Sequence, residues 1–130
     1  MSGPHRLARL DHVQLAMPPG EEAAAEAFYR DLLGFEVLPK PPVLAARGGR
    51  WFGAGENGTE VQVHLGVEED FRPARKAHPA IVVEQLDSLV RLLEQAGSPV
   101  RFDGDHPGVR RCYVDDPFGN RIELIDHAAG

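Results

Sequence analysis

The two halves of this chain carry polar residues at matching positions, and this internal repeat constrains the fold more than any other feature. His12 and His78 each stand at the start of an apolar segment, whereas Gln62 and Glu123 each lie in the last such segment of their half. The two histidines are 66 residues apart and the other pair is 61 residues apart, so a five-residue gap aligns the halves. A fold with approximate twofold symmetry would therefore bring these four side chains together.

Each half is predicted to contain one strand, one helix and three further strands. Alternating apolar and polar residues predict the strands, because successive side chains of a strand point to opposite faces. Two helices are predicted, at about 21–33 and 87–96 with Asp87 as a possible N-cap, from apolar residues spaced three and four apart. The predicted strands cover about 10–17, 35–38, 50–54, 60–65, 78–83, 100–102, 110–114 and 121–125.

Length and repeat together predict one domain of the α+β class, residues 1–130, built as two βαβββ modules that form a concave mixed sheet. Module 1 covers about 7–65, a charged linker covers 66–77, and module 2 covers about 78–127. Strand alternation places the apolar side chains against the helices. It therefore places the four matched polar residues on the concave side.

Composition excludes several classes of protein. A hydrophobic content of 42% and a charged content of 26% are typical of soluble globular proteins. No apolar run approaches the roughly 20 residues that span a bilayer, and a net charge of −6 argues against nucleic-acid binding. The single Cys112 cannot form an internal disulfide and is expected to be inert packing. With no secretory signal evident, these features favour a cytoplasmic protein with no nucleic-acid or membrane partner.

The four matched residues are expected to bind a divalent metal ion. Imidazole and carboxylate groups are ordinary ligands for Zn, Mn, Fe, Co or Ni. His12, His78 and Glu123 would leave coordination positions open for water or substrate oxygens, and Gln62 could add a weak fourth ligand. His64 shares the strand face of Gln62, so it could replace Gln62, touch substrate or, as we favour, form a hydrogen bond at the rim of the groove.

Three stretches of the chain resemble the vicinal oxygen chelate superfamily, which includes glyoxalase I, bleomycin-resistance proteins, fosfomycin-resistance transferases, methylmalonyl-CoA epimerase and extradiol dioxygenases. These stretches are Leu10–Val13, Ala27–Phe35 and Asp115–Leu124. The resemblance extends over about residues 7–127. Position by position, it implies a metal site made of His12, Gln62, His78 and Glu123.

The resemblance also implies an enzyme, either a glyoxalase-like lyase or isomerase or a dioxygenase, which chelates vicinal oxygens of a small-molecule substrate. Proton transfer beside a carbonyl needs a base, and Gln62 stands where glyoxalase I usually has Glu. Glu123, if it left the metal, or His64 could be the catalytic base. Group transfer is a further alternative, and a metal-free protein that sequesters a small molecule, as in the bleomycin-resistance branch, is another. A homodimer is common in the family, and the modules could pair within one chain or across such a dimer.

Substrate contacts are expected from Trp51, Arg50 and Arg111. The arginines could bind a carboxylate or phosphate through paired donors, or they could balance aspartates nearby in the sequence. Trp51 lies beside a glycine-rich loop and is the best candidate for an aromatic wall of the substrate pocket.

Overall fold

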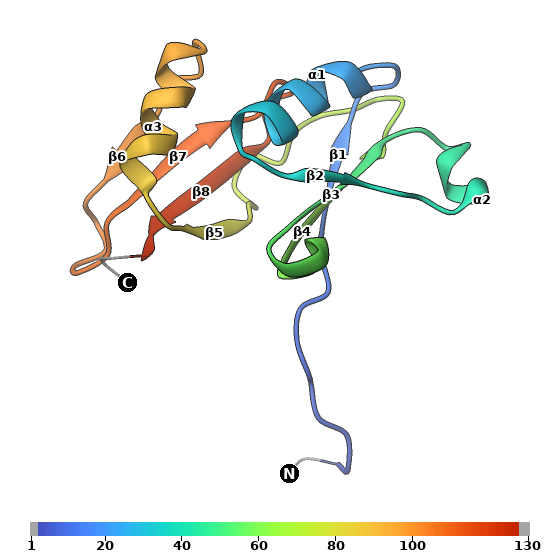
Figure 1. Ribbon diagram of the computed structural model, residues 1–130, viewed down its shortest axis with the longest axis horizontal. Helices are drawn as coiled ribbons and strands as arrows, with labels where there is room; N and C mark the ends of the chain where they lie inside the picture. Colours follow the sequence, from blue (N-terminus) through green and yellow to red (C-terminus); the bar gives the residue numbers. More distant parts are fainter. Residues whose placement is uncertain (1–2, 128–130) are drawn as a thin grey trace.

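The strands of the protein form two four-stranded sheets, ordered β1-β4-β3-β2 and β5-β8-β7-β6. The structure is a computed structural model that describes residues 3–127. In Figure 1 the strands of module 1 (blue to green) lie beside those of module 2 (yellow to red). The α+β class and the two-module organisation are confirmed, with the strands divided between two sheets. No helix within residues 3–127 has the length and apolar character to cross a membrane.

Module 1 begins with a parallel pair, β1 with β4, and continues with antiparallel pairs of β4 with β3 and of β3 with β2. The predicted helix is confirmed, although its second half is π-helical. A short helix, α2, lies where a loop was expected, because Pro42 occupies its first position, where a missing N–H costs no hydrogen bond. The elements are β1 (Val13–Met17), α1 (Glu22–Glu26), η1 (Ala27–Leu32), β2 (Glu36–Leu38), α2 (Pro42–Ala45), β3 (Arg50–Ala54), η2 (Glu56–Gly58) and β4 (Val61–Val67).

Module 2 repeats this order with the same parallel and antiparallel pairing. Its helix begins after Gln85, which adopts a left-handed φ of 61°, so the expected N-cap at Asp87 was wrong. Asp87 instead lies in the first turn, where its carboxylate favours the positive end of the helix dipole. The elements are β5 (Ala80–Val83), α3 (Leu86–Gln95), β6 (Arg101–Asp103), β7 (Arg111–Asp115) and β8 (Arg121–Asp126).

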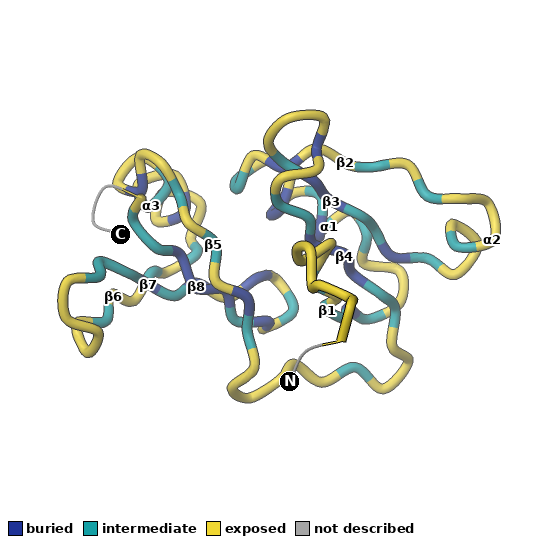
Figure 2. The backbone as a smooth tube through the Cα atoms, turned by 90° about the horizontal axis from the view of Figure 1, so that it is seen from below, coloured by how far each residue is buried: buried dark blue, intermediate teal, exposed yellow. Residues whose placement is uncertain are grey.

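One core joins the two modules. Apolar residues of the central strands are buried as predicted, with Val63 and Leu65 in β4 and Ile122 and Leu124 in β8. His64 and Glu123, which lie between them on the other face, are also buried. The buried segments (dark blue in Figure 2) lie mainly on the strands and helices of both modules, whereas most of the loops and the N-terminal segment are exposed. Cys112 is fully buried in this core, and burial raises the pKa of its thiol to about 11. The prediction that Cys112 packs in the core is therefore confirmed.

A buried polar network fixes module 2 to module 1. The hydroxyl of Tyr29 in η1 donates to Asp116 Oδ2 at 2.7 Å, across the two modules. Asn120 Nδ2 donates to the same carboxylate oxygen and to the carbonyl oxygen of Ala16, each at 2.8 Å. Burial, with the nearby Asp116 carboxylate, raises the pKa of Tyr29 well above its usual value, so the hydroxyl stays a proton donor. The turn between β7 and β8 is therefore anchored to β1 and the first helix.

Candidate metal-binding half-sites

Three stacked rings mark the first half-site, on module 1. His12 lies just before β1, His64 lies in β4, and Trp51 lies opposite His64 in the register of β3 with β4. The His12 and His64 ring centroids are 3.9 Å apart with planes at 11°, and the His64 and Trp51 centroids are 4.4 Å apart with planes at 14°. His64 is only 6% exposed. It is therefore enclosed between two rings and does not lie at the open rim that we expected.

Burial fixes the protonation state of His64. Desolvation, followed by repulsion from His12, lowers the pKa of His64 to about 4, so the ring is neutral near pH 7. Its Nε2 lies 3.2 Å from Gln62 Oε1, and a hydrogen bond to this oxygen requires the ring nitrogen to donate. The ring thus orients the Gln62 amide and is a much weaker base than an ordinary histidine.

A carboxylate orients His12. His12 Nδ1 lies 2.8 Å from Asp11 Oδ2, and the carboxylate can only accept, so Nδ1 donates. The hydrogen bonds from His12 and Arg9 lower the pKa of Asp11, which holds the carboxylate in its charged form. In a neutral ring this arrangement leaves the Nε2 lone pair available to a metal, as in the carboxylate–histidine–metal units of many metalloproteins. Sequence reasoning missed Asp11, although an acidic residue directly before His12 was visible.

The second half-site lies on module 2 and is built from charged groups. His78 precedes β5, and its Nε2 lies 2.8 Å from Oε1 of Glu123 in β8. His78 Nδ1 lies 2.7 Å from the carbonyl oxygen of Lys76. The Tyr113 ring packs edge-on against His78, with centroids 5.5 Å apart. Glu123 is only 7% exposed, so its carboxylate depends on these neighbours for charge compensation.

The donor atoms of this second half-site fit a metal ion. The carbonyl of Lys76 can only accept a hydrogen bond, so His78 Nδ1 must carry a proton. His78 Nε2 and the Glu123 carboxylate oxygen then face each other, and a neutral imidazole and a carboxylate both present lone pairs. At 2.8 Å the two atoms share a hydrogen bond through a proton, and a metal ion bound by both would take the place of that proton. The nitrogen and oxygen donors are those that Zn and its first-row neighbours accept.

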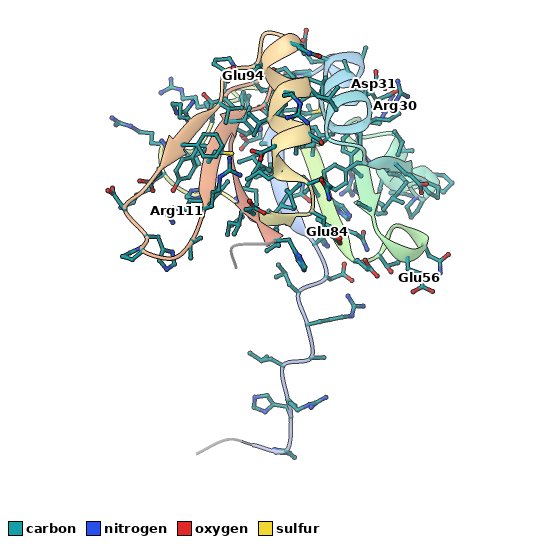
Figure 3. The ribbon with its side chains drawn as sticks, turned by 60° about the vertical axis from the view of Figure 1, so that its left-hand side comes forward. Arg30, Asp31, Glu56, Glu84, Glu94 and Arg111 are labelled. Atoms are coloured by element: carbon teal, nitrogen blue, oxygen red, sulfur yellow. The ribbon has the colours of Figure 1, made fainter. Side chains whose placement is uncertain are left out.

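The two arginines expected to touch substrate are both paired with carboxylates. Arg111 binds Asp103 Oδ2 through Nε at 3.0 Å and Nη2 at 2.6 Å, and its Nη1 lies 3.4 Å from Glu123 Oε2. Arg50 Nε donates to Glu26 Oε2 at 3.0 Å. Figure 3 shows Arg111 on the strands of module 2, on the other side of the molecule from Glu56 of module 1. Most hydrogen bonds of Arg111 are with Asp103, so they fit the alternative role of balancing a nearby aspartate.

The two half-sites border different cavities. His12, Gln62, His64 and Trp51 line a cavity of about 510 Å³ on module 1. His78 lines another, of about 700 Å³, bounded mainly by β1, the end of β4 and the linker. Within residues 3–127, no three His, Cys, Asp or Glu side chains are grouped so as to hold a metal ion. The single chain therefore presents the matched residues as two halves, one on each module.

Known proteins show the same organisation. The sequence matches the family model described as the Glyoxalase/Bleomycin resistance protein/Dioxygenase superfamily over residues 9–124. No curated protein matches. A crystal structure of a glyoxalase family protein from Bacillus anthracis is 44% identical, with a TM-score of 0.88 over 95% of this chain and 98% of that chain.

Two more distant structures share the fold alone. A fosfomycin resistance protein from Listeria monocytogenes is 14% identical, with a TM-score of 0.71 over 93% of this chain and 94% of that chain. An antibiotic binding protein from a Streptomyces species is 23% identical, with a TM-score of 0.66 over 93% of this chain and 98% of that chain. The family match covers most of the chain, and the chain belongs to the glyoxalase, bleomycin resistance protein and dioxygenase superfamily.

Proposed function

We propose that this protein is a divalent-metal-dependent enzyme that acts on a small molecule through two adjacent substrate oxygens. His12, Gln62, His78 and Glu123 would hold the metal, which would be Zn, Mn, Fe, Co or Ni. One observation carries this proposal: in both histidines Nδ1 is held by an oxygen acceptor, which directs Nε2 to the ligand role. The same arrangement at two matched positions is hard to explain by packing alone.

We further propose that a homodimer completes the site. The first half-site lines one cavity and the second half-site borders another, so each needs a partner surface that carries the missing ligands. In a symmetric dimer, module 1 of one chain would face module 2 of the other, and the reverse pairing would form a second identical site. Each metal would then have ligands from both chains.

The proposed reaction is proton transfer next to a carbonyl, in a lyase or isomerase of the glyoxalase type, with ring-cleaving dioxygenation and group transfer as alternatives. When bound, the metal would supply Lewis acidity that stabilises an enolate-like anion. Glu123, once it leaves the metal, is the better candidate for the base, because the lowered pKa of His64 makes that ring a poor proton acceptor. Arg111 would hold the second Glu123 oxygen while the first moves a proton. The His64 and Trp51 rings would exclude water from one wall.

Elemental analysis of the purified protein, followed by mixing of variants, tests this proposal. His12→Ala and Glu123→Ala should each abolish stoichiometric metal binding. When the two variants are refolded together, each mixed dimer should regain one metal site, because one of its two sites receives both intact modules. A site formed within one chain would regain none. Wild-type protein that takes up no first-row metal would overturn the metal-dependent function.

A binding protein that sequesters a small molecule is the second candidate. The stacked Trp51 and His64 rings beside the cavity of about 510 Å³ offer a flat apolar wall, and one protein of the same fold is an antibiotic binding protein. Tight small-molecule binding by metal-free protein, with no turnover of a hemithioacetal or of a catechol when metal is added, would favour this candidate.

A further inference from the structure

Two cationic side chains border the cavity of module 1 beside the first half-site. Lys40, between β2 and α2, and Arg47, just after α2, line this cavity together with His12, Gln62 and Trp51. The Lys40 Nζ donates to the carbonyl oxygen of Gly48 at 2.5 Å and lies 5.9 Å from the centroid of the Trp51 ring. The loop that carries α2 thus places positive charge against an aromatic wall.

This positive charge is poorly compensated, unlike that of Arg50 and Arg111. The guanidinium of Arg47 forms no hydrogen bond or ion pair within residues 3–127, and its side chain is exposed. By contrast, Arg50 pairs with Glu26 and Arg111 pairs with Asp103. Burial, together with repulsion from Arg50 and Arg47, lowers the pKa of Lys40, even though Glu22 opposes the shift. The cations here repel one another, so an anion between them would relieve the repulsion.

The acidic residue that lines the same cavity does not neutralise it. Asp11 already binds His12 at 2.8 Å and Arg9 at 3.2 Å. A ligand that enters the cavity would meet Lys40 and Arg47 from the loop that carries α2, and the Trp51 ring beside Lys40. A volume of about 510 Å³ suits a small organic molecule rather than a polymer.

We propose that this cavity binds an anionic oxygen group, a carboxylate or a phosphonate-type oxyanion, between Lys40 and Arg47, with the organic part of the ligand against Trp51. The inference rests on the proposed function in one respect: if the protein is the proposed enzyme, its substrate is a small, acidic molecule. Binding of the anion itself requires no metal.

Trp51 is the single tryptophan of the chain, so its fluorescence reports directly on this cavity. Metal-free protein is titrated with benzoate, with phenylphosphonate and with the neutral benzamide. We expect saturable quenching by at least one anion, weakened by added salt, with benzamide at least about tenfold weaker because it lacks the charge. The two anions distinguish a carboxylate site from a phosphonate-type site.

Lys40→Met and Arg47→Gln should each weaken binding of the anion about tenfold, which is the loss expected for one charge-assisted hydrogen bond. Arg91→Gln is the matched control, because it removes one positive charge from the exposed face of α3 and should leave binding unchanged. Thermal unfolding confirms that each variant is folded.

Equal binding of benzamide, absence of saturable quenching by both anions, or full anion affinity in Lys40→Met and Arg47→Gln would overturn the inference. Anion binding by a protein that never takes up metal would leave the inference intact while removing the proposed enzyme. Metal uptake by a protein that binds neither anion would support the proposed enzyme and contradict its acidic substrate.

Discussion

The two modules place different chemistry at equivalent positions of the same fold. In module 1, Trp51 is paired across β3 and β4 with His64, two residues beyond Gln62. In module 2, Arg111 is paired across β7 and β8 with Ile125, two residues beyond Glu123. A tryptophan in one module therefore corresponds to an arginine in the other.

Because of this difference, the two modules would contribute different groups to the proposed site. On module 1, His12 is held by ring stacking and by one exposed carboxylate, beside a neutral His64. On module 2, His78 is held by a buried carboxylate that Arg111 also contacts. Directly beside the proposed ligands, module 1 places stacked aromatic rings, whereas module 2 places a buried carboxylate that an arginine contacts. If this division is correct, substitutions at equivalent positions should have unequal effects.

The largest expected difference is between the matched residues Glu123 and Gln62. Glu123→Ala removes an anionic ligand together with its contacts to His78 and Arg111, so metal affinity should fall by more than about 100-fold, the upper range for loss of an outer partner. Gln62→Ala removes a neutral oxygen and should cost about tenfold or less. Competition with a chromogenic chelator measures both affinities.

Glu123→Gln serves as the matched control, because it keeps the shape of the side chain and removes its charge. If charge dominates on module 2, this variant should resemble Glu123→Ala. Equal losses in the Gln62 and Glu123 variants would contradict the proposed division between the modules.

The next largest effect concerns the protonation of His64, which has no ionisable counterpart at Ile125 of module 2. The pKa of about 4 lies below the usual 6.5, so between these values the unfolded chain binds a proton that the folded chain does not. The free energy of unfolding should therefore fall as pH falls from about 6.5 to about 4, by an amount on the order of 3 kcal/mol. Urea unfolding of metal-free protein across this pH range measures it.

His64→Gln should remove this part of the pH dependence, whereas His106→Gln, in an exposed loop, should retain it. If the free energy of unfolding has the same pH dependence in the wild type and in His64→Gln, the pKa of His64 is not lowered and the prediction is wrong.

The junction between the modules supports a third prediction. Tyr29→Phe removes the buried hydrogen bond to Asp116 and should lower the free energy of unfolding by about 2 kcal/mol. Because Tyr29 belongs to module 1 and Asp116 to module 2, hydrogen exchange should accelerate in both β4 and β8. Tyr113→Phe is the control, since the hydroxyl of Tyr113 forms no hydrogen bond within residues 3–127. Faster exchange in one module alone would show that the modules unfold separately.

Much of the fold follows from local patterns in the sequence. Strand alternation identified the buried residues Val63, Leu65, Ile122 and Leu124, because one face of each sheet must be covered. A glycine follows the end of each helix, and Gly34 and Gly97 adopt positive φ values of 89° and 84°, as residues that end helices often do. Helix α2 was missed because Pro41 and Pro42 suggest the absence of a helix. Pro42 in fact occupies the first helical position, where proline is tolerated.

The site was harder to predict, because its partners are distant in sequence. The pairing of His78 with Glu123 followed from the repeat, but the stacking of His64 between His12 and Trp51 depends on the register of three strands. Strand alternation predicts on which face of the strand His64 lies, but it does not predict how deeply the ring is buried. The ligand assignment itself, and the pairing of modules across a dimer, stay predictions.

The smallest expected effect separates the two arginines that both seemed able to bind substrate. Arg111 contacts Asp103 and the second oxygen of Glu123, so Arg111→Gln should weaken metal affinity by about tenfold through loss of an outer partner. Arg50 makes an ion pair with Glu26 that is partly exposed to solvent, so Arg50→Gln should cost no more than about 1 kcal/mol of stability and leave metal affinity unchanged. Chelator competition and urea unfolding of the two variants measure both effects. A loss of metal affinity in Arg50→Gln equal to that in Arg111→Gln would mean that the effect of Arg111 does not depend on its contact with Glu123.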